Sequence, residues 1–157
     1  MSNVRFAVAE DAARIAEILE SVDKLHSDNL PDIFHGKSPY YPECEIEEII
    51  EGDEKSFIVS TNEQDEITGV LVFWINEKQD DNLFADSKEL WIDTNCVEEQ
   101  YRGKGYGKML LDYVKEIAEE HECDRIILHV WAFNEHAFEF YKSQGMEISS
   151  YSMEYKL

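Results

Sequence analysis

Three glycines at alternate positions, Gly103, Gly105 and Gly107, join a strand-like segment to a helix-like one, and this junction constrains the fold strongly. The segment before it, "ELWIDTNCV" from Glu89 to Val97, is rich in apolar residues and predicts a strand. After the glycines, apolar residues recur at steps of three and four, which predicts a helix with one face packed on a sheet. The sequence therefore predicts an α/β (α+β) fold.

The rest of the chain predicts further strands and helices without a repeat or an interior linker. The expected order is strand, helix, helix, three strands, helix, strand, helix, strand, and the last strand is "EISSYSMEYKL", residues 147–157. Residues 26–42 form an irregular connection with three prolines, of the kind that often carries a binding surface. At this length we expect a single domain, residues 1–157.

The glycine junction is also basic in a very acidic chain. The whole chain has 35 Asp and Glu against 14 Lys and Arg, yet Arg102, Lys104 and Lys108 lie within seven residues. Lysines near the start of a helix have the wrong sign for the helix dipole unless an anion binds there. Glycines let several backbone N–H groups converge on such an anion, so the stretch predicts a pyrophosphate site.

Two common phosphate-binding motifs do not fit the spacing. The ATP and GTP motif needs four residues between its first glycine and the Gly-Lys pair, but three separate Gly103 from Gly107, and Met109 replaces the Ser or Thr. The dinucleotide motif is G-x-G-x-x-G early in a βαβ unit, whereas this stretch is G-x-G-x-G late in the chain. The residues do match Q-x-x-G-x-G, from Gln100 to Gly105.

That motif, directly after an apolar strand, resembles the one with which the GNAT superfamily of N-acetyltransferases binds the pyrophosphate of acetyl-CoA. A second segment, "NEHAFEFYKSQGM", is similar to the family's other cofactor segment, at Asn134, Ala137, Phe140, Tyr141, Gly145 and Met146. Met146 replaces the commoner Phe. The resemblance covers about residues 90–146. It implies a mixed, mostly antiparallel sheet of about six to seven strands flanked by about four helices.

The resemblance also implies roles for individual residues. Tyr141 would protonate the departing thiolate, and Asp93 would act as the base or anchor the amine. His26 and Phe34 lie in a segment similar to the variable acceptor-binding region. Acetyl-CoA would be the co-substrate, held by Cys96, Val97, Gln100, Arg102, Gly103, Lys104, Gly105, Tyr106, Gly107, Lys108, Asn134 and Ala137.

Structural roles are alternatives to several of these assignments. Tyr141 could be an aromatic packed between helix and sheet, Val97 a core residue rather than an oxyanion donor, and Asp93 a structural hydrogen-bonding group. Glu98 and Glu99 are other candidates for the base. We expect Cys96 to be a small buried thiol and not a nucleophile, because the sequence indicates no Cys-His pair.

We expect His129 to be a core residue, as a histidine within an apolar run usually is, and not a base. It lies within "IILHV" of the predicted strand at residues 124–132.

Composition limits the partners. A net charge of −21 argues against nucleic acid and anionic membranes and favours a cationic amine, either a small molecule or a peptide. Three widely spaced cysteines, no apolar run of membrane-spanning length and no signal-like N-terminus predict a cytoplasmic protein without a bound metal. The family resemblance makes a homodimer an expectation. A non-catalytic acyl-CoA-binding module of the same fold is the alternative function.

Overall fold

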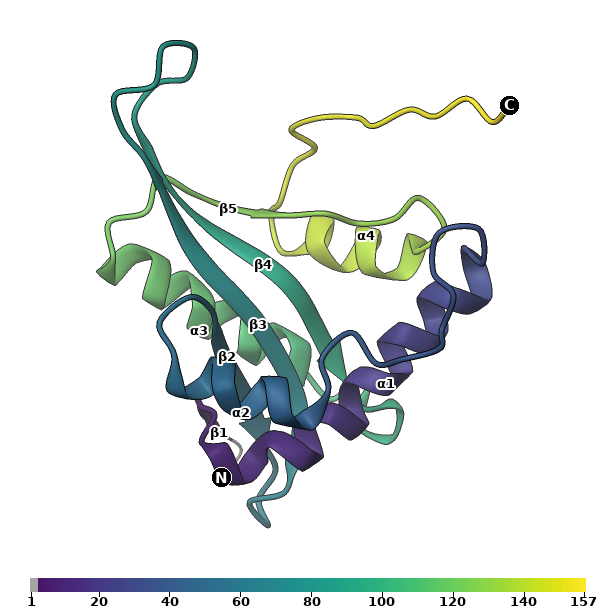
Figure 1. Ribbon diagram of the computed structural model, residues 1–157. Coiled ribbons are helices and arrows are strands. Elements are labelled where there is room, and N and C mark those ends of the chain that lie inside the picture. The colour runs from purple at the N-terminus through teal and green to yellow at the C-terminus, as the bar shows by residue number, and fades with distance from the viewer. Residues whose placement is uncertain (1–2) are drawn as a thin grey trace.

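Five strands form one mixed sheet, and they lie in it in the same order as in the sequence (Figure 1). The strands are β1 (Asn3–Phe6), β2 (Ser56–Thr61), β3 (Ile67–Lys78), β4 (Ser87–Val97) and β5 (Arg125–Leu128). Neighbouring strands run antiparallel except β4 and β5, which are parallel. The structure, a computed structural model, describes residues 3–157.

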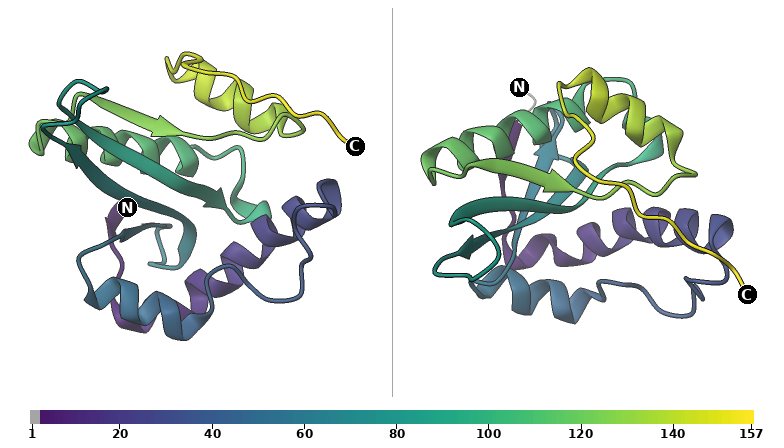
Figure 2. Two further views of the ribbon diagram at one scale, coloured as in Figure 1. Left: turned by 45° about the horizontal axis from the view of Figure 1, so that its top comes forward. Right: turned by 90° about the horizontal axis from the view of Figure 1, so that it is seen from above.

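Helices cover both faces of this sheet, which gives three layers (Figure 2). One face carries α1 and α2, and the other carries α3 and α4. The helices are α1 (Ala12–Asn29), α2 (Glu43–Glu51), α3 (Tyr106–Glu120) and α4 (Glu135–Ser143), with short 3-10 turns η1 (Ala9–Asp11) and η2 (Glu99–Tyr101). No helix within residues 3–157 is both long enough and apolar enough to cross a bilayer.

Side-chain alternation along the central strands divides the core in two. In β3, Val70 and Val72 pack with α1 and α2, whereas Leu71 and Phe73 pack with α3. All four side chains are almost completely buried. This two-sided burial explains why "ITGVLVFWIN" is a nearly continuous apolar run.

A β-bulge interrupts β4 at Asp93. Ile92 is opposite Phe73 and Thr94 is opposite Val72, so Asp93 is the extra residue between two consecutive pairs. The alternation of β4 therefore shifts by one position. Its even-numbered residues face α3 before the bulge, and its odd-numbered residues do so after it.

The α/β fold with a mixed, mostly antiparallel sheet and four helices is confirmed, and the predicted order of elements holds as far as α4. The sheet has five strands instead of about six to seven. The strand predicted at residues 147–157 is wrong for this structure, because these residues extend away from the body without pairing with another strand (Figure 1). A strand requires hydrogen bonds from a neighbour, and an alternating sequence does not supply one.

Candidate active site

The candidate site lies where β4 and β5 diverge. Their parallel pairing ends at Ile92 and Leu128. Beyond it, β4 stays paired with β3 as far as Val97, while the chain after Leu128 turns away toward α4 (Figure 2). The edge of β4 from Asp93 to Val97 is therefore not paired with β5. We refer to the region between the two diverging strands as the wedge.

The helix α3 begins at the end of the wedge where β4 stops. Gly103 and Gly105 have φ angles of 75° and 91°, a left-handed conformation that favours glycine, and Gly105 is the residue that precedes the helix. The first helical bond runs from the Met109 N–H to the Gly105 carbonyl. The N–H groups of residues 106–108 consequently have no partner within the helix, and no side chain caps it. This helix start is suited to an anion.

Basic side chains surround this helix start. Arg102 donates from Nε to the Val97 carbonyl at 3.0 Å, Lys104 lies 5.3 Å from the centre of the Tyr101 ring, and Lys108 pairs with Asp112 in the next turn. No acidic residue lies in the first turn of α3. The arrangement therefore keeps positive charge at this end of the wedge.

Gly107 lies in a packed position, and its backbone angle is not one that favours glycine. A Cβ atom there would lie 3.6 Å from Val97 Cγ2 and 3.7 Å from Phe140 Cζ, so β4, α3 and α4 meet at this glycine. Both distances are ordinary van der Waals contacts, so a Cβ atom would fit between these neighbours. The start of α3 is thereby held against the wedge.

Asn95 contributes an unpaired polar atom to the same region. Its Nδ2 donates weakly to the Gly107 carbonyl at 3.4 Å, but its buried Oδ1 has no donor among the described residues. Buried acceptors are nearly always paired in folded proteins, so this atom is suited to an N–H group of a ligand. No sequence motif predicts a role for this side chain, because the bulge that turns it toward α3 leaves no clear sequence signal.

Tyr141 lies beside Asn95 on the same face of the sheet. Its half-buried ring packs 5.1 Å from that of Phe140. Burial raises the pKa of Tyr141 to about 12, although the adjacent Asn95 amide lowers it. At neutral pH this phenol is therefore a hydrogen-bond donor.

Asn134 caps α4 at the other side of the wedge. Its Oδ1 accepts a hydrogen bond from the Ala137 N–H at 3.1 Å, so these two predicted residues are joined. The cap occupies the side-chain oxygen and leaves Nδ2 for a ligand. Asn134 therefore has a structural role whatever else it binds.

Asp93 lies on the opposite face of the sheet, in a cluster with two residues from other elements. Tyr41 donates its hydroxyl hydrogen to Asp93 Oδ2, and Lys55 Nζ lies 2.7 Å from the Tyr41 oxygen and 3.8 Å from Asp93. Burial, followed by the hydrogen bond to Asp93, raises the pKa of Tyr41 well above its usual value. The Lys55 ammonium also lies 5.2 Å from the ring centres of Tyr41 and Trp74. Tyr41 and Lys55 belong to no sequence motif, so only the fold associates them with Asp93.

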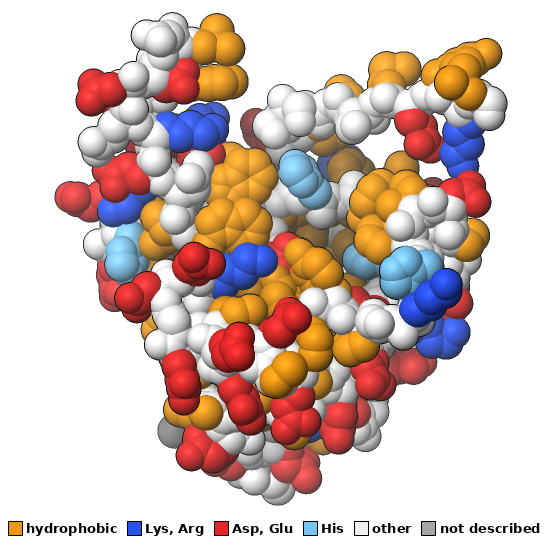
Figure 3. Space-filling view, viewed as in Figure 1, with side chains coloured by type: hydrophobic (Ala, Val, Ile, Leu, Met, Phe, Trp, Pro, Cys, Tyr) orange, Lys and Arg blue, Asp and Glu red, His pale blue; other side chains and the backbone are white. Residues whose placement is uncertain are grey.

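Aromatic side chains extend this cluster across the same face. Trp74 stacks on Trp91 at 6.1 Å, and Trp91 meets the ring of His129 at 5.6 Å. His129 is exposed, so its expected core position is wrong. Figure 3 shows hydrophobic side chains gathered in the middle of this face, with acidic side chains below them over α1 and α2.

The two predicted acceptor residues, His26 and Phe34, are brought together. Their rings stack at 5.1 Å, and they contact Phe133 and Trp131 of the β5–α4 connection at 6.0 and 5.6 Å, respectively. Burial lowers the pKa of His26, and Asp23 opposes the effect. The last part of α1 and the loop after it thus contact the β5–α4 connection through aromatic side chains.

Three predicted cofactor residues have side chains directed away from the wedge or into the core. Cys96 is buried against α1, with its Sγ 3.5 Å from Ser21 Oγ, and burial raises the pKa of its thiol. The ring of Tyr106 is buried and packs edge-on against Tyr101, and Val97 belongs to the core between the sheet and α3. Only the backbone groups of these residues could bind a cofactor. Gln100 is exposed in η2.

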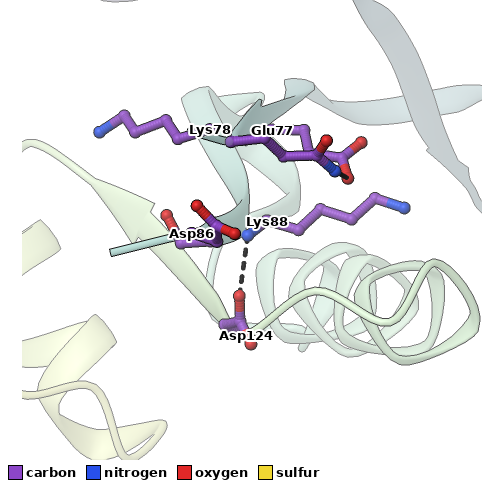
Figure 4. A pocket seen from close by; sticks show the side chains of 7 residues that line it. Glu77, Lys78, Asp86, Lys88 and Asp124 are labelled. Atoms are coloured by element: carbon purple, nitrogen blue, oxygen red, sulfur yellow. Dashed lines mark hydrogen bonds between the residues drawn. The ribbon is translucent and has the colours of Figure 1, made fainter. Parts of the chain in front are cut away.

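A separate pocket of about 190 Å³ lies at the other end of β4, roughly 30 Å along the strand from Val97 (Figure 4). There the Lys88 N–H donates to Asp124 Oδ2 at 2.8 Å, which ties β4 to the start of β5. This bond has a structural role. Within residues 3–157, no group of three or more His, Cys, Asp or Glu side chains could hold a metal ion.

Comparisons with known proteins agree with this geometry. The sequence model described as the acetyltransferase (GNAT) family matches residues 19–146, more than half of the chain. A spermine/spermidine N(1)-acetyltransferase of Bacillus subtilis is 36% identical over 61 residues, which are 38% of this chain and 40% of that protein. The match thus spans less than half of the relative.

Solved structures share the fold over the whole chain. A variant of the BH1408 protein from Bacillus halodurans superposes with a TM-score of 0.94 over 99% of both chains, at 26% identity. An aminoglycoside acetyltransferase from an uncultured soil sample, solved with sisomicin, gives a TM-score of 0.74 over 99% of this chain and 96% of that one. At 14% identity the second likeness concerns the fold alone.

Proposed function

This chain belongs to the acetyltransferase (GNAT) family, and on that premise we propose that it transfers the acetyl group of acetyl-CoA to a primary amine by direct attack in a ternary complex. The wedge is the observation that carries the proposal. At one end it has the unpaired N–H groups and basic side chains at the start of α3. The phenol of Tyr141 lies on one face of β4, and the carboxylate of Asp93 lies on the other. We propose that residues 1–157 form one catalytic domain.

The residues around the wedge are suited to acetyl-CoA, which supplies a thioester with an electrophilic carbonyl carbon. The N–H groups of residues 106–108, together with Arg102 and Lys104, would hold its pyrophosphate. Asn95 Oδ1 would accept a hydrogen bond from an amide N–H of its pantetheine arm. Asn134 Nδ2 would donate one to an amide carbonyl of the same arm. The free edge of β4 offers further backbone groups, including the proposed oxyanion donor at Val97.

In the proposed reaction the amine nitrogen bonds to the thioester carbon, the C–S bond breaks, and one proton moves from nitrogen to sulfur. Tyr141 would donate to the departing thiolate. A phenol with a pKa of about 12 is a weaker acid than a thiol of about 8.5, so full transfer must be coupled to recovery of the amine proton. Asp93, oriented by Tyr41 and Lys55, would anchor or deprotonate the amine.

We propose a cationic amine as the acceptor and consider polyamines the most favoured class. The net charge of −21 attracts cations, and the rings around Lys55 already hold one ammonium group in a cation–π arrangement. The partial match to a spermine/spermidine acetyltransferase supports this preference. The proposed setting is the cytoplasm, where Cys44, Cys96 and Cys123 would stay reduced.

The test combines binding with turnover. Calorimetric titration with acetyl-CoA, CoA and ATP should reveal selective binding of the two CoA compounds. Thiol release from acetyl-CoA should then depend on an added amine, in a panel of spermidine, spermine, an aminoglycoside and a basic peptide. CoA binding without release for any amine would favour the non-catalytic module. Absence of CoA binding would remove the basis for the proposed phosphate site.

A further inference from the structure

Lys55 is a primary amine that the fold already holds beside Asp93. It lies directly before β2, and its Nζ reaches over the ring of Trp74 in β3 toward the bulge of β4. The Nζ lies 3.8 Å from Asp93 Oδ2 and donates to the Tyr41 oxygen at 2.7 Å. In the proposed reaction the acceptor amine contacts the same carboxylate. Lys55 therefore places a primary amine where that reaction needs one.

The surroundings of this ammonium group are those of a binding site for a cation. The ring centres of Tyr41 and Trp74 both lie 5.2 Å from the Nζ. The side chain of Lys55 is only 29% exposed, and Tyr41 is buried. Cation–π contacts and ion pairs strengthen when water is partly excluded. Lys55 is thus held in place, and an oriented amine within the same molecule reacts as if it were at a very high concentration.

We propose that Lys55 is itself an acceptor, and that the protein acetylates this side chain when no free amine is bound. The proposal rests on the proposed function, because it uses the same thioester, carboxylate and phenol. The Nζ loses one proton to Asp93 and bonds to the thioester carbon, and the C–S bond breaks. Tyr141 donates a proton to the departing sulfur and recovers one from the Nζ. The products are N-acetyl-lysine, CoA and the proton that Asp93 releases to water.

Lys78 provides a matched comparison within the same chain. Its Nζ lies 3.8 Å from Glu89 Oε2 and 5.1 Å from the centre of the Phe84 ring, and its side chain is 38% exposed. The ion pair and the ring contact resemble those of Lys55. Lys78 is opposite Ser87, however, at the end of β4 remote from the start of α3. Uncatalysed acetylation by dissolved acetyl-CoA should therefore modify Lys78 at least as fast as Lys55.

Peptide mass spectrometry after incubation with acetyl-CoA, without a free amine, tests the proposal. Lys55 should be acetylated at least about tenfold faster than Lys78. Tyr141→Phe should slow the reaction at Lys55 about 100-fold or more, as for loss of any positioned proton donor. An acetyl group found on Lys55 of the purified natural chain, but not of Tyr141→Phe, is the same expected result.

Two further measurements identify the residue and the route. By intact mass, Lys55→Arg should lose the fast acetylation while keeping its positive charge, and Lys78→Arg should retain it. The half-time should not change when the protein is diluted about tenfold, because the amine and the site belong to one chain. Equal rates at Lys55 and Lys78, fast acetylation of Lys55→Arg, or a rate proportional to protein concentration overturns the proposal.

Thiol release in the presence of free amines separates this proposal from the proposed function. Amine-dependent release by a protein whose Lys55 stays unmodified overturns the proposal and leaves the proposed function intact. Acetylation of Lys55 without turnover of any free amine supports the proposal and contradicts the proposed acceptor. Absence of transfer to Lys55 and to every amine refutes both.

Discussion

Tyr41 donates its hydroxyl hydrogen to Asp93, which lies 52 residues later in the chain. Tyr41 belongs to the connection before α2, and Asp93 is the bulged residue of β4. Lys55 contacts both side chains, so the carboxylate has a fixed orientation and an adjacent positive charge. In the proposed reaction this cluster controls the acceptor and leaves the cofactor site unchanged.

Tyr41→Phe should therefore impair use of the amine without affecting acetyl-CoA. A hydrogen bond to a charged group is worth about 1.5–3 kcal/mol, which predicts a loss of roughly 10- to 100-fold in kcat/KM for the amine. The measurement is steady-state thiol release with the amine varied, beside calorimetry with acetyl-CoA. Tyr40→Phe is the control, because Tyr40 is 63% exposed and adjacent. Equal effects of both substitutions would contradict the assignment.

Tyr141→Phe should lower kcat by about 10²- to 10⁴-fold, as expected for loss of a positioned proton donor. The Kd for acetyl-CoA should change little, since the ring and its packing against Phe140 are preserved. Single-turnover thiol release measures the chemical step. Tyr113→Phe on α3 provides a control, and a variant at Tyr141 with natural kcat would show that its role is packing.

Lys108→Ala and Lys115→Ala form a matched pair, because both ammonium groups pair with Asp112. Only Lys108 lies in the first turn of α3. Its removal should weaken acetyl-CoA binding about two- to fivefold, from an interaction of about 0.3–1 kcal/mol, and should leave the stability of the free protein unchanged or slightly higher. Lys115→Ala should not alter binding. Calorimetry at two salt concentrations measures the Kd for acetyl-CoA of each variant. Equal losses of affinity in the two variants would rule out a phosphate at the helix start.

Stability should fall at alkaline pH because of Tyr141. Its pKa is about 12 in the folded state and about 10 when unfolded, so the folded state retains this proton over that interval. The contribution is complete below pH 10 and is lost as pH rises to 12, and a difference of two pKa units amounts to about 2.7 kcal/mol. Urea unfolding at pH 9 and pH 11.5 should therefore show a smaller decrease for Tyr141→Phe than for the natural chain. Parallel decreases would contradict the buried position of this phenol.

Much of the proposed cofactor site was predictable from the sequence because its residues lie close together in the chain. The glycines, the basic side chains and the start of α3 lie within one short stretch, and backbone conformation alone brings them together. The predicted pair His26 and Phe34 also meet, because they flank one helix end.

The proposed acceptor site was less predictable, because it depends on contacts between distant segments. Tyr41 and Lys55 reach Asp93 only after the sheet has formed, and Asn95 acquires its position through the bulge. No motif marks these residues. The prediction of a strand at residues 147–157 was wrong for a related reason. Alternation predicts a strand but does not identify the neighbour that pairs with it.

The bulge at Asp93 shifts the alternation of side chains along β4 by one position. If β4 paired with β3 without a bulge at Asp93, the residues after it would shift by one partner and exchange faces, so that Cys96 would turn toward α3 and Asn95 toward α1. The bulge thus presents the carboxylate of Asp93 to one side of the sheet and the amide of Asn95 to the other, as the proposed reaction with two substrates requires. Deleting Asp93 would instead remove the bulge and leave the residues after it opposite their present partners on β3, at the cost of the carboxylate.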